Sequence, residues 1–406
     1  MNWRVPILVA GTVAAAWAAD LDSVALLSRV RSKVLDNAKR IPRYICRQEI
    51  ERQVYDPLKR SRSCDSLPAQ GATNIGKKLE LRSSDRAKLD VILGEAAELF
   101  AWPGGRSFDT DDPGKLLPAG FSGSGDFAGF VLGVFSLDQI AFEYIGPCDG
   151  DSCARFGYDV PVAVSGYVAK TPFNRVTLGY HGTFDVDSRS ANLIHMTVIP
   201  TDVSTALPGV CDLRTGMTYT RATMDSGEFT IPESTEKEFL SADGEYFVNR
   251  SFYKGCRQYT SESTLTFGDD DLPATPLEPA KVSAALPVAG SEVQLRLVTK
   301  IDSERNGAGD ALEATLVHPV PDTRGGTIRA GTVFLGRLGQ VEKVYLPREH
   351  IILTMRFNTI ILNGAPVALT LSPIGKMDAR GEEIYSFLKG KLLLDKNFVS
   401  RWRVVP

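Results

Sequence analysis

Six cysteines that follow an export-type N-terminus constrain this chain more than any other feature of its sequence. Arg4 precedes an apolar stretch from Val5 to Ala16, and the segment ends at Ala16-Trp17-Ala18. This order of charged, apolar and small residues is typical of a signal peptide, which we expect over residues 1–18, and retention as an uncleaved anchor is the alternative. In an oxidising compartment an even cysteine count indicates disulfides. We therefore expect a periplasmic or secreted protein whose disulfides involve Cys46, Cys64, Cys148, Cys153, Cys211 and Cys256.

The cysteine spacing leaves the pairing open, because six cysteines allow fifteen connectivities. Cys148 and Cys153 flank Asp149-Gly150-Asp151 and would close the tip of a hairpin. A sequential pairing, with Cys46 bonded to Cys64 and Cys211 to Cys256, completes the pattern that we expect. The chain contains no C-x-x-C motif, so a structural role is favoured over a redox role.

Bulk composition excludes several classes of protein. Of the 406 residues, 43% are hydrophobic and 23% are charged, which is typical of a soluble globular protein long enough for two or more domains. The formal net charge is -3 and no basic stretch stands out, so we expect no nucleic-acid partner. No stretch after the signal is long and apolar enough to cross a bilayer as a helix, so the mature chain is expected to have no transmembrane span.

Hydrophobic periodicity predicts a mainly β protein with some helix, of the α+β class. A helix is predicted from Asp20 to Lys39, where apolar residues recur at steps of three and four. Many short strands at nearly even spacing follow between residues 141 and 267. They indicate a large curved antiparallel sheet or a half-open barrel with helices. We expect residues 20–267 to form one disulfide-stapled β-rich domain.

A boundary is predicted at residues 268–281, an acidic and proline-rich linker. Alternating residues in the segment 282–371 indicate a small β-barrel or sandwich domain, with a two-residue hairpin turn at Asn363-Gly364. The tail, residues 372–406, is expected to include a helix from Glu382 to Leu394. Arg401, Trp402 and Arg403 fit a docking edge, although a frayed end is the preferred interpretation.

An aromatic helix is predicted in the segment 120–142, with Asp126 as its N-cap. Its favoured role is packing on a sheet, and the alternative is the wall or plug of a ligand site, because aromatic faces build both. The candidate ligand-binding residues share one predicted helical face and are Phe127, Phe130, Val131, Val134 and Phe135.

The segment 302–313 matches the spacing of an EF-hand-like calcium loop. The candidate metal ligands are Asp302, Glu304, Asn306, Asp310 and Glu313. The preceding residues are strand-like rather than helical, so the favoured interpretation is a polar hairpin loop.

No catalytic motif is present. The chain lacks G-x-S-x-G, Walker and H-E-x-x-H signatures, and we expect no cofactor. The glycine-rich stretch from Gly120 to Gly125 lacks a following lysine, and its expected role is a flexible entry into the aromatic helix. His181 and His195 are interpreted as structural. We expect a protein that is not an enzyme, and a hydrolase with an unrecognised site is the least favoured alternative.

Residues 24–267 resemble a family of secreted bacterial proteins of uncharacterised role. The matching stretches include Pro42-Arg43-Tyr44-Ile45-Cys46 and Gly255-Cys256-Arg257-Gln258-Tyr259. The run from Tyr180 to Asp187 is also similar to one in periplasmic lipoprotein carriers. That resemblance implies a half-open β-barrel with an apolar concavity for acyl chains, and a lid or plug role for the aromatic helix.

Residues 286–371 resemble the β-domain of conjugation and secretion channel proteins, through Gly290-Ser291-Glu292-Val293, Gly309-Asp310 and the run from Arg329 to Arg337. The resemblance implies an interaction domain, and the channel proteins' membrane-crossing elements are absent. Together, the sequence predicts an exported non-enzymatic cell-envelope protein that binds an apolar small molecule or lipid, or an envelope protein partner. The alternative is a structural scaffold of the envelope or of a secretion apparatus.

Overall fold

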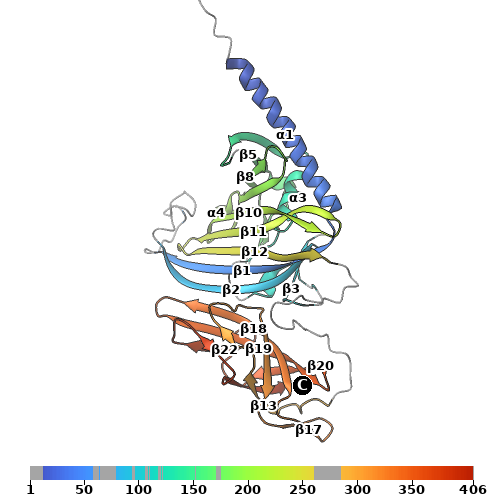
Figure 1. Cartoon of the computed structure of the whole chain (residues 1–406). Helices are drawn as coiled ribbons and strands as arrows, with labels where there is room; N and C mark the ends of the chain where they lie inside the picture. The colour runs from blue at the N-terminus through green and yellow to red at the C-terminus, as the bar shows by residue number, and fades with distance from the viewer. Residues whose placement is uncertain are drawn as a thin grey trace, which may run out of the picture. The chain divides into compact units, whose positions relative to one another are not determined.

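The computed structural model describes residues 12–57, 64, 79–93, 97–105, 108, 110–117, 120, 122–150, 152–170, 175–259 and 285–405, without the side chains of residues 12–21. Most of this part of the chain is β-strand with few helices, and its large antiparallel sheet is not closed into a barrel (Figure 1). The predicted fold class, mainly β with some helix, is confirmed.

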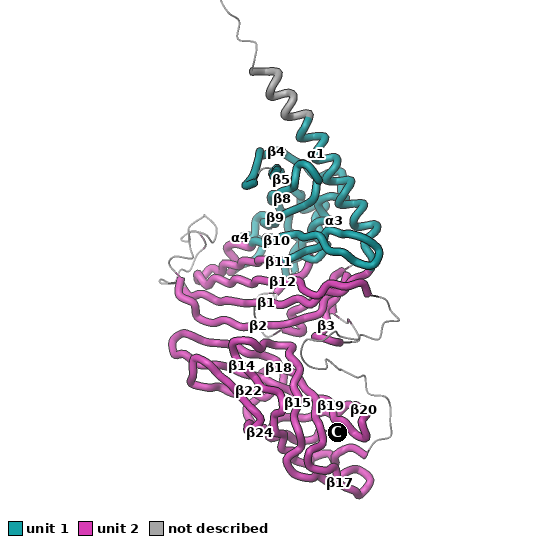
Figure 2. The backbone as a smooth tube through the Cα atoms, in the orientation of Figure 1, with its two compact units in different colours: residues 1–42, 126–208, 214–233 teal, residues 43–125, 209–213, 234–406 magenta. Residues whose placement is uncertain are grey.

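Two compact units divide the chain (Figure 2). Unit 1 contains residues 1–42, 126–208 and 214–233, and unit 2 contains residues 43–125, 209–213 and 234–406. The boundary falls within two long strands, β10 (Val210–Met224) and β11 (Gly227–Ser241). The linker predicted at residues 268–281 lies outside the described residues, so the domain boundaries drawn from the sequence stay a prediction.

Unit 1 combines helices with a series of antiparallel strands. β4 pairs with β5, β5 with β8, β8 with β9, and β9 with β10. Short connections join β4 to β5 and β8 to β9, whereas η4, β6 and β7 lie between β5 and β8 in the chain. Apart from the shared strands β10 and β11, the elements of the unit are α1 (Thr12–Arg40), α3 (Gly129–Phe135), β4 (Ala141–Pro147), β5 (Cys153–Val160), η4 (Val162–Val164), β6 (Val168–Lys170), β7 (Arg175–Thr177), β8 (Tyr180–Asp187), β9 (Leu193–Pro200) and α4 (Val203–Ala206).

The predicted helix from Asp20 to Lys39 is confirmed within α1, which packs against α3. Val30 is buried in the core of unit 1, and Leu27 and Val34 pack against that core, as the three-and-four spacing predicts. Val24 of the same predicted set is 61% exposed, and Leu26, outside it, is buried. Polar contacts also hold the helix. Arg29 donates to the carbonyls of Ser188 and Arg189, and Lys33 donates to the carbonyl of Ser190. The second half of α1 is therefore a structural part of the unit.

Unit 2 begins with a long antiparallel ladder of β1 (Tyr44–Pro57), β2 (Leu79–Leu93), β3 (Glu98–Ala101) and β12 (Tyr246–Gln258), next to η3 (Pro113–Lys115). β1 lies between β2 and β12, β3 extends the ladder beyond β2, and the unit 2 part of β11 extends it beyond β12. The sequence predicts separate strands at residues 79–82 and 88–93, but β2 runs without a break. Its polar middle is compatible with a strand because Asp85 pairs with Arg52 on β1.

The C-terminal strands of unit 2 surround a core that includes Phe334, Leu338, Met355, Phe357 and Trp402. These strands are β13 (Glu292–Leu297), β14 (Ile301–Asp302), β15 (Ala311–Leu316), β16 (Val320–Pro321), β17 (Thr327–Ile328), β18 (Val333–Val344), β19 (His350–Leu362), β20 (Ala365–Ala368), β21 (Thr370–Pro373), β22 (Glu383–Phe387), β23 (Leu393–Leu394) and β24 (Val399–Val405). The predicted Asn363-Gly364 turn joins β19 to β20, and both residues have the positive φ angles, 54° and 77°, that this turn requires.

Two predictions about the tail are wrong. The segment from Glu382 to Leu394 contains strands β22 and β23 rather than a helix. Trp402 lies in β24, pairs with Val293 on β13, and is fully buried, so the end of the chain is neither frayed nor a docking edge. Its alternation of buried and exposed residues is the period-two signal of a strand.

All six cysteines are paired, but two of the three expected pairs are wrong. The bonds join Cys46 to Cys256, Cys64 to Cys211, and Cys148 to Cys153. The first two are nested rather than sequential. The first bond follows from the strand order: β1 and β12 are neighbours, which places Cys46 beside Cys256 despite a sequence separation of 210 positions.

Candidate ligand-binding site

The predicted aromatic helix exists but begins later than expected. Its first backbone hydrogen bond runs from the N–H of Leu132 to the carbonyl of Ala128, so Ala128 is the N-cap and the predicted cap, Asp126, lies outside the helix. At its other end, Arg31 on α1 donates to the carbonyls of Phe135 and Leu137. A cation at a helix C-terminus is favourable because the last carbonyls carry partial negative charge.

The five candidate ligand-binding residues do not share one environment. Val134 and Phe135 are fully buried, and Phe127 is buried just before the helix. Phe130 and Val131 are only partly buried and pack at the margin of the core. The predicted helical face is therefore divided between residues that fill the core and residues that reach its surface.

Aromatic rings fill the core behind α3. The ring of Phe184 is the centre, with Phe135 at 5.0 Å and Phe156 at 5.3 Å between ring centroids. Such edge-to-face and stacked pairs contribute about 0.5–1.5 kcal/mol each beyond the burial of apolar area. In this structure Phe135 is thus a packing residue, which is the favoured interpretation of the sequence.

The outer part of the helix packs on tyrosines. The ring of Phe130 lies 5.6 Å from that of Tyr167 and 5.9 Å from that of Tyr180, between centroids. Gly133 permits this approach, because a Cβ there would lie 3.0 Å from the Tyr180 hydroxyl. Burial raises the pKa of Tyr167 and of Tyr180 to about 12, so both hydroxyls stay neutral at physiological pH.

Apolar side chains continue outward along the segment beside Tyr167. Val164 and Tyr167 are partly buried against the core, while Val162 is 58% exposed and Val168 is 36% exposed. We call Phe130, Val131, Val162, Val164, Tyr167 and Val168 the outer apolar set. Large apolar side chains gathered at a surface are a common mark of an interaction site.

A separate open concavity of about 470 Å³ lies elsewhere in unit 1. Its lining is mainly polar and comprises Asp187, Ser190, Asn192, Leu193, Ile194, Tyr219, Thr220, Arg221 and Thr230. None of the five candidate residues belongs to it. This lining suits a polar group better than an acyl chain.

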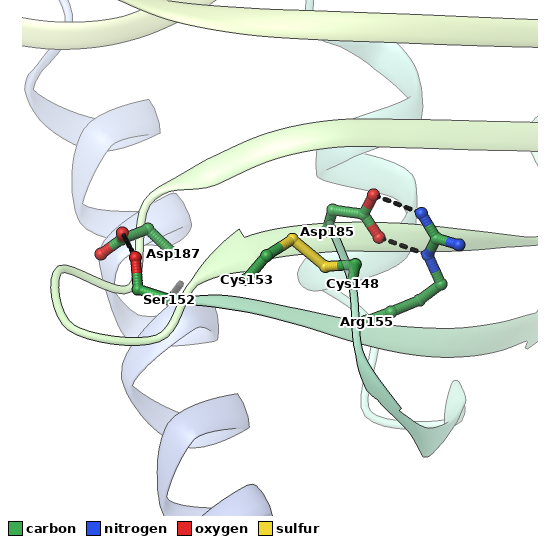
Figure 3. Close-up of a disulfide and its surroundings, with 6 residues drawn as sticks. All are labelled: Cys148, Ser152, Cys153, Arg155, Asp185 and Asp187. Carbon is green, nitrogen blue, oxygen red and sulfur yellow. Dashed lines mark hydrogen bonds and ion pairs between the residues drawn. A yellow bond between two sulfur atoms is a disulfide. The ribbon is translucent and has the colours of Figure 1, made fainter. Parts of the chain in front are cut away.

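The Cys148–Cys153 disulfide closes the β4–β5 hairpin beside two carboxylates (Figure 3). Asp185 is held by Arg155 through two hydrogen bonds of 2.6 and 2.7 Å, from Nε and Nη2. Asp187 accepts from the Ser152 hydroxyl at 2.6 Å and from the Ser190 N–H at 2.6 Å. These contacts, led by that of Ser152, lower the pKa of Asp187 to about 2.

This cluster offers little free chemistry. Cys148, Cys153 and Asp185 place their ligand-type atoms within 4.8 Å of one another, but the two sulfur atoms are bonded together and Arg155 occupies the carboxylate. His195 lies directly opposite Asp185 in the β8–β9 ladder, and burial lowers its pKa. The cluster therefore stabilises a hairpin end, in line with the structural roles expected for these cysteines and this histidine.

The candidate calcium ligands are engaged within the protein. Asp310 contacts Lys88, and it accepts hydrogen bonds from the Asn306 side chain and the Gly307 N–H. Glu304 pairs with Lys391, and the Asp302 carboxylate accepts from the Glu304 N–H. The contact of Glu313 is made by its backbone N–H, which donates to Thr299, and does not involve its carboxylate. These contacts support the favoured interpretation, a polar loop between β14 and β15, and the calcium site stays an untested prediction.

The glycine-rich stretch lies over polar residues of the unit 2 ladder. Lys237 donates to the Gly123 carbonyl at 2.6 Å, and the Gly125 N–H donates to Glu98 at 2.8 Å. Gly120 has a φ of 145° and lies close to Arg52, since a Cβ there would be 3.1 Å from its Nη1. The sequence predicts the flexibility of this stretch but not its cationic neighbours.

Among the described residues, no helix has the length and apolar character needed to cross a membrane. No family model matches the chain, and no curated protein matches it. Among solved structures, the chain is similar to a DUF1329 family protein from Desulfovibrio piger, with 10% sequence identity and a TM-score of 0.24. The match covers 59% of this chain and 95% of the other. A TM-score this low carries no argument about fold or function, and the resemblances to lipoprotein carriers and to channel β-domains stay predictions.

Proposed function

We propose that this chain is an exported cell-envelope protein that holds an apolar ligand, such as a lipid, without transforming it. The single observation that carries the binding role is the division of α3. Its inner residues fill an aromatic core, whereas Phe130 and Val131 border the outer apolar set. Export is supported by the complete pairing of six cysteines.

The division of α3 suits a ligand at the margin of the core better than one inside it. Val134 and Phe135 contact their neighbours closely, so a ligand there would have to displace packed rings at a cost of several kcal/mol. An acyl chain lying on Phe130, Val131 and Tyr167 would cover surface that the core leaves partly exposed. Each buried methylene would contribute about 0.8 kcal/mol.

Organic extraction of protein purified from its native envelope tests the proposal. Mass spectrometry of the extract should find a lipid or another apolar compound in stoichiometric amount. Phe130→Ser and Val131→Ser should each reduce that amount several-fold, while Val24→Ser, at a 61% exposed position on α1, should leave it unchanged. An extract free of apolar compounds, or equal recovery from all four proteins, would contradict the proposal.

A second candidate function, an envelope scaffold that binds a protein partner, is favoured by strand β4. Tyr144 is 41% exposed and Ile145 is 55% exposed there, which is unusual for two adjacent large apolar residues. A photo-crosslinking residue at position 145 should then capture one partner protein in cells, whereas the same residue at position 162 should not. Capture at position 162 alone would instead favour the outer apolar set as the contact surface.

A further inference from the structure

A group of charged residues in unit 2 lies between the N-terminal ladder and the C-terminal strands. Two of its carboxylates already have cations. Arg47 Nε contacts Asp90 Oδ1 at 2.5 Å, and Lys88 Nζ contacts Asp310 Oδ1 at 2.7 Å. Asp90 also accepts the Gly104 N–H through its other oxygen, at 2.7 Å. Asp90 and Asp310 are therefore each already paired with a cation.

Two further arginines of the same group face each other. Arg337 on β18 lies directly opposite Arg356 on β19. Like charges directly opposite in a sheet are destabilising. The carboxylate that pairs with Arg356 is Glu382, at 3.9 Å, and Arg337 forms no ion pair with a carboxylate of the described residues. Among the described residues the pair therefore has one carboxylate partner, Glu382, which contacts Arg356 and leaves Arg337 without one.

The ring of Trp102 lies close to both guanidinium groups. The Cζ atoms of Arg337 and Arg356 lie 5.4 Å and 5.9 Å from the centroid of the Trp102 ring. Gly309 makes room for this ring: its φ is 97°, and a Cβ there would lie 3.0 Å from the ring. Cation–π contacts of this kind contribute about 0.5–2 kcal/mol and fix the direction of each guanidinium plane.

Among the described residues, Arg337 uses little of its hydrogen-bonding capacity. A guanidinium carries five N–H donors in a planar fork that matches the oxygens of a carboxylate or phosphate. Arg337 donates one hydrogen bond, from Nη1 to the Gly309 carbonyl at 2.9 Å. Burial and the charge of Arg356 lower the pKa of Arg337 to about 10, so it remains a cation at neutral pH. The Arg356 side chain is 42% exposed, so its guanidinium can be reached from solvent.

We propose that Arg337, Arg356 and Trp102 form a binding site for an oxyanion, a phosphate or carboxylate group that is either free or the headgroup of an amphiphile. An anion between the two guanidinium groups would neutralise their repulsion and accept charge-assisted hydrogen bonds. The site belongs to unit 2 and does not depend on the apolar ligand proposed for unit 1.

Calorimetric and thermal-shift titrations of the whole mature chain test this site, with inorganic phosphate and acetate as probes. Sodium chloride at equal ionic strength is the reference, because it separates site binding from general screening. Phosphate or acetate should raise the melting temperature beyond the chloride value. Arg337→Gln and Arg356→Gln should each weaken binding about tenfold or more, since hydrogen bonds to charged groups are the strong ones. Arg337→Lys, which keeps the charge but loses the planar fork, should lie between them and the wild type.

Arg305→Gln is the matched control, because this arginine lies in the same unit with its side chain 87% exposed. If Arg337→Gln fails to fold by circular dichroism, the exposed Arg356→Gln variant decides the outcome alone. Sedimentation with phosphatidylglycerol or phosphatidylcholine vesicles separates the two sources of the anion: binding to the former that needs Arg356 identifies a lipid headgroup, and phosphate binding alone identifies a free anion. The proposal is overturned if neither anion exceeds chloride and no vesicle binding depends on Arg356, or if Arg356→Gln binds as the wild type does.

Discussion

The two units stabilise their β-rich interiors in different ways. Unit 1 relies on aromatic packing, with Phe135 and Phe156 both packed against Phe184. The ladder of unit 2 instead buries a polar row across four strands. Asp85, Arg52, Asn249 and Lys237 are successive cross-strand neighbours in that row. An apolar core of aromatic rings is stabilised by burial itself and needs only a short disulfide. A polar ladder gains less from burial, so its stability depends on specific partner residues.

The disulfides follow the same division. The pair in unit 1, Cys148–Cys153, spans five positions, while those in unit 2 span 210 and 147 positions. A bond that closes a longer loop removes more conformational entropy from the unfolded chain in the usual model. The less apolar ladder thus carries the stronger covalent constraints.

The largest expected effect comes from removing the longest link. Cys46→Ser with Cys256→Ser should lower the free energy of unfolding by about 5 kcal/mol, since the closed loop spans 210 positions. Urea denaturation followed by circular dichroism measures this change. A loss of unfolding free energy no greater than that of the variant with Cys148→Ser and Cys153→Ser would contradict this difference between the units.

Two core truncations should each cost about 3–5 kcal/mol, because they leave cavities at fully buried aromatic positions. Phe135→Ala removes a ring from unit 1, and Trp402→Ala removes one from unit 2. Differential scanning calorimetry should show which transition moves in each case. Val162→Ala, at a 58% exposed position, is the control and should change the free energy of unfolding by less than about 0.5 kcal/mol. Identical shifts of a single transition by both truncations would show that the units unfold together.

Removal of the short link should have a smaller effect. Cys148→Ser with Cys153→Ser should reduce the free energy of unfolding by about 2 kcal/mol, because the closed loop spans only five positions. The β4–β5 backbone pairing should survive, since Cys148 N–H also donates to the Cys153 carbonyl. Amide exchange of Phe156 and Tyr158 reports on that pairing, and rapid exchange in the variant would count against this view.

The smallest effect concerns acid. The pKa of Asp187 is lowered to about 2 by the Ser152 hydroxyl and the Ser190 N–H. Its contribution to stability is therefore present above its unfolded pKa, near pH 4, and is lost as the pH falls toward 2. Asp187→Asn should lower the melting temperature at neutral pH by a small amount and flatten the decline between about pH 4 and pH 2. Melting curves at several pH values measure this effect. An unchanged decline of the melting temperature in acid would show that Asp187 does not contribute to the acid sensitivity.

The predictions were correct where a residue spacing is compatible with only one local structure, such as a helix or a hairpin turn. The three-and-four spacing of Leu27, Val30 and Val34 predicted α1, and Asn363-Gly364 predicted the β19–β20 turn. They were wrong at residues 382–394 and at Trp402. In those places short strands are held by partners far away in the chain, such as β13 for Trp402 and β19 for β22.

The candidate sites show the same limit. The sequence located the aromatic helix, but it could not divide Val134 and Phe135 from Phe130 and Val131, because that depends on which side meets Phe184 and which meets Tyr167. It gave no sign of the arginine pair. Trp102 is far from Arg337 and Arg356 in the chain, and a hairpin separates the two arginines. The pairing of β18 with β19 places the arginines opposite each other, and Trp102 contacts both.

By itself, the sequence determined that the chain is mainly β and that it carries a helix near its start, because local periodicity sets those features. Only the tertiary structure decided which cysteines are bonded and which charges face each other. Both depend on strand order and register, and a single register step moves every side chain to the other face of a sheet. The nested Cys46–Cys256 bond and the Arg337–Arg356 pair are consequences of that order.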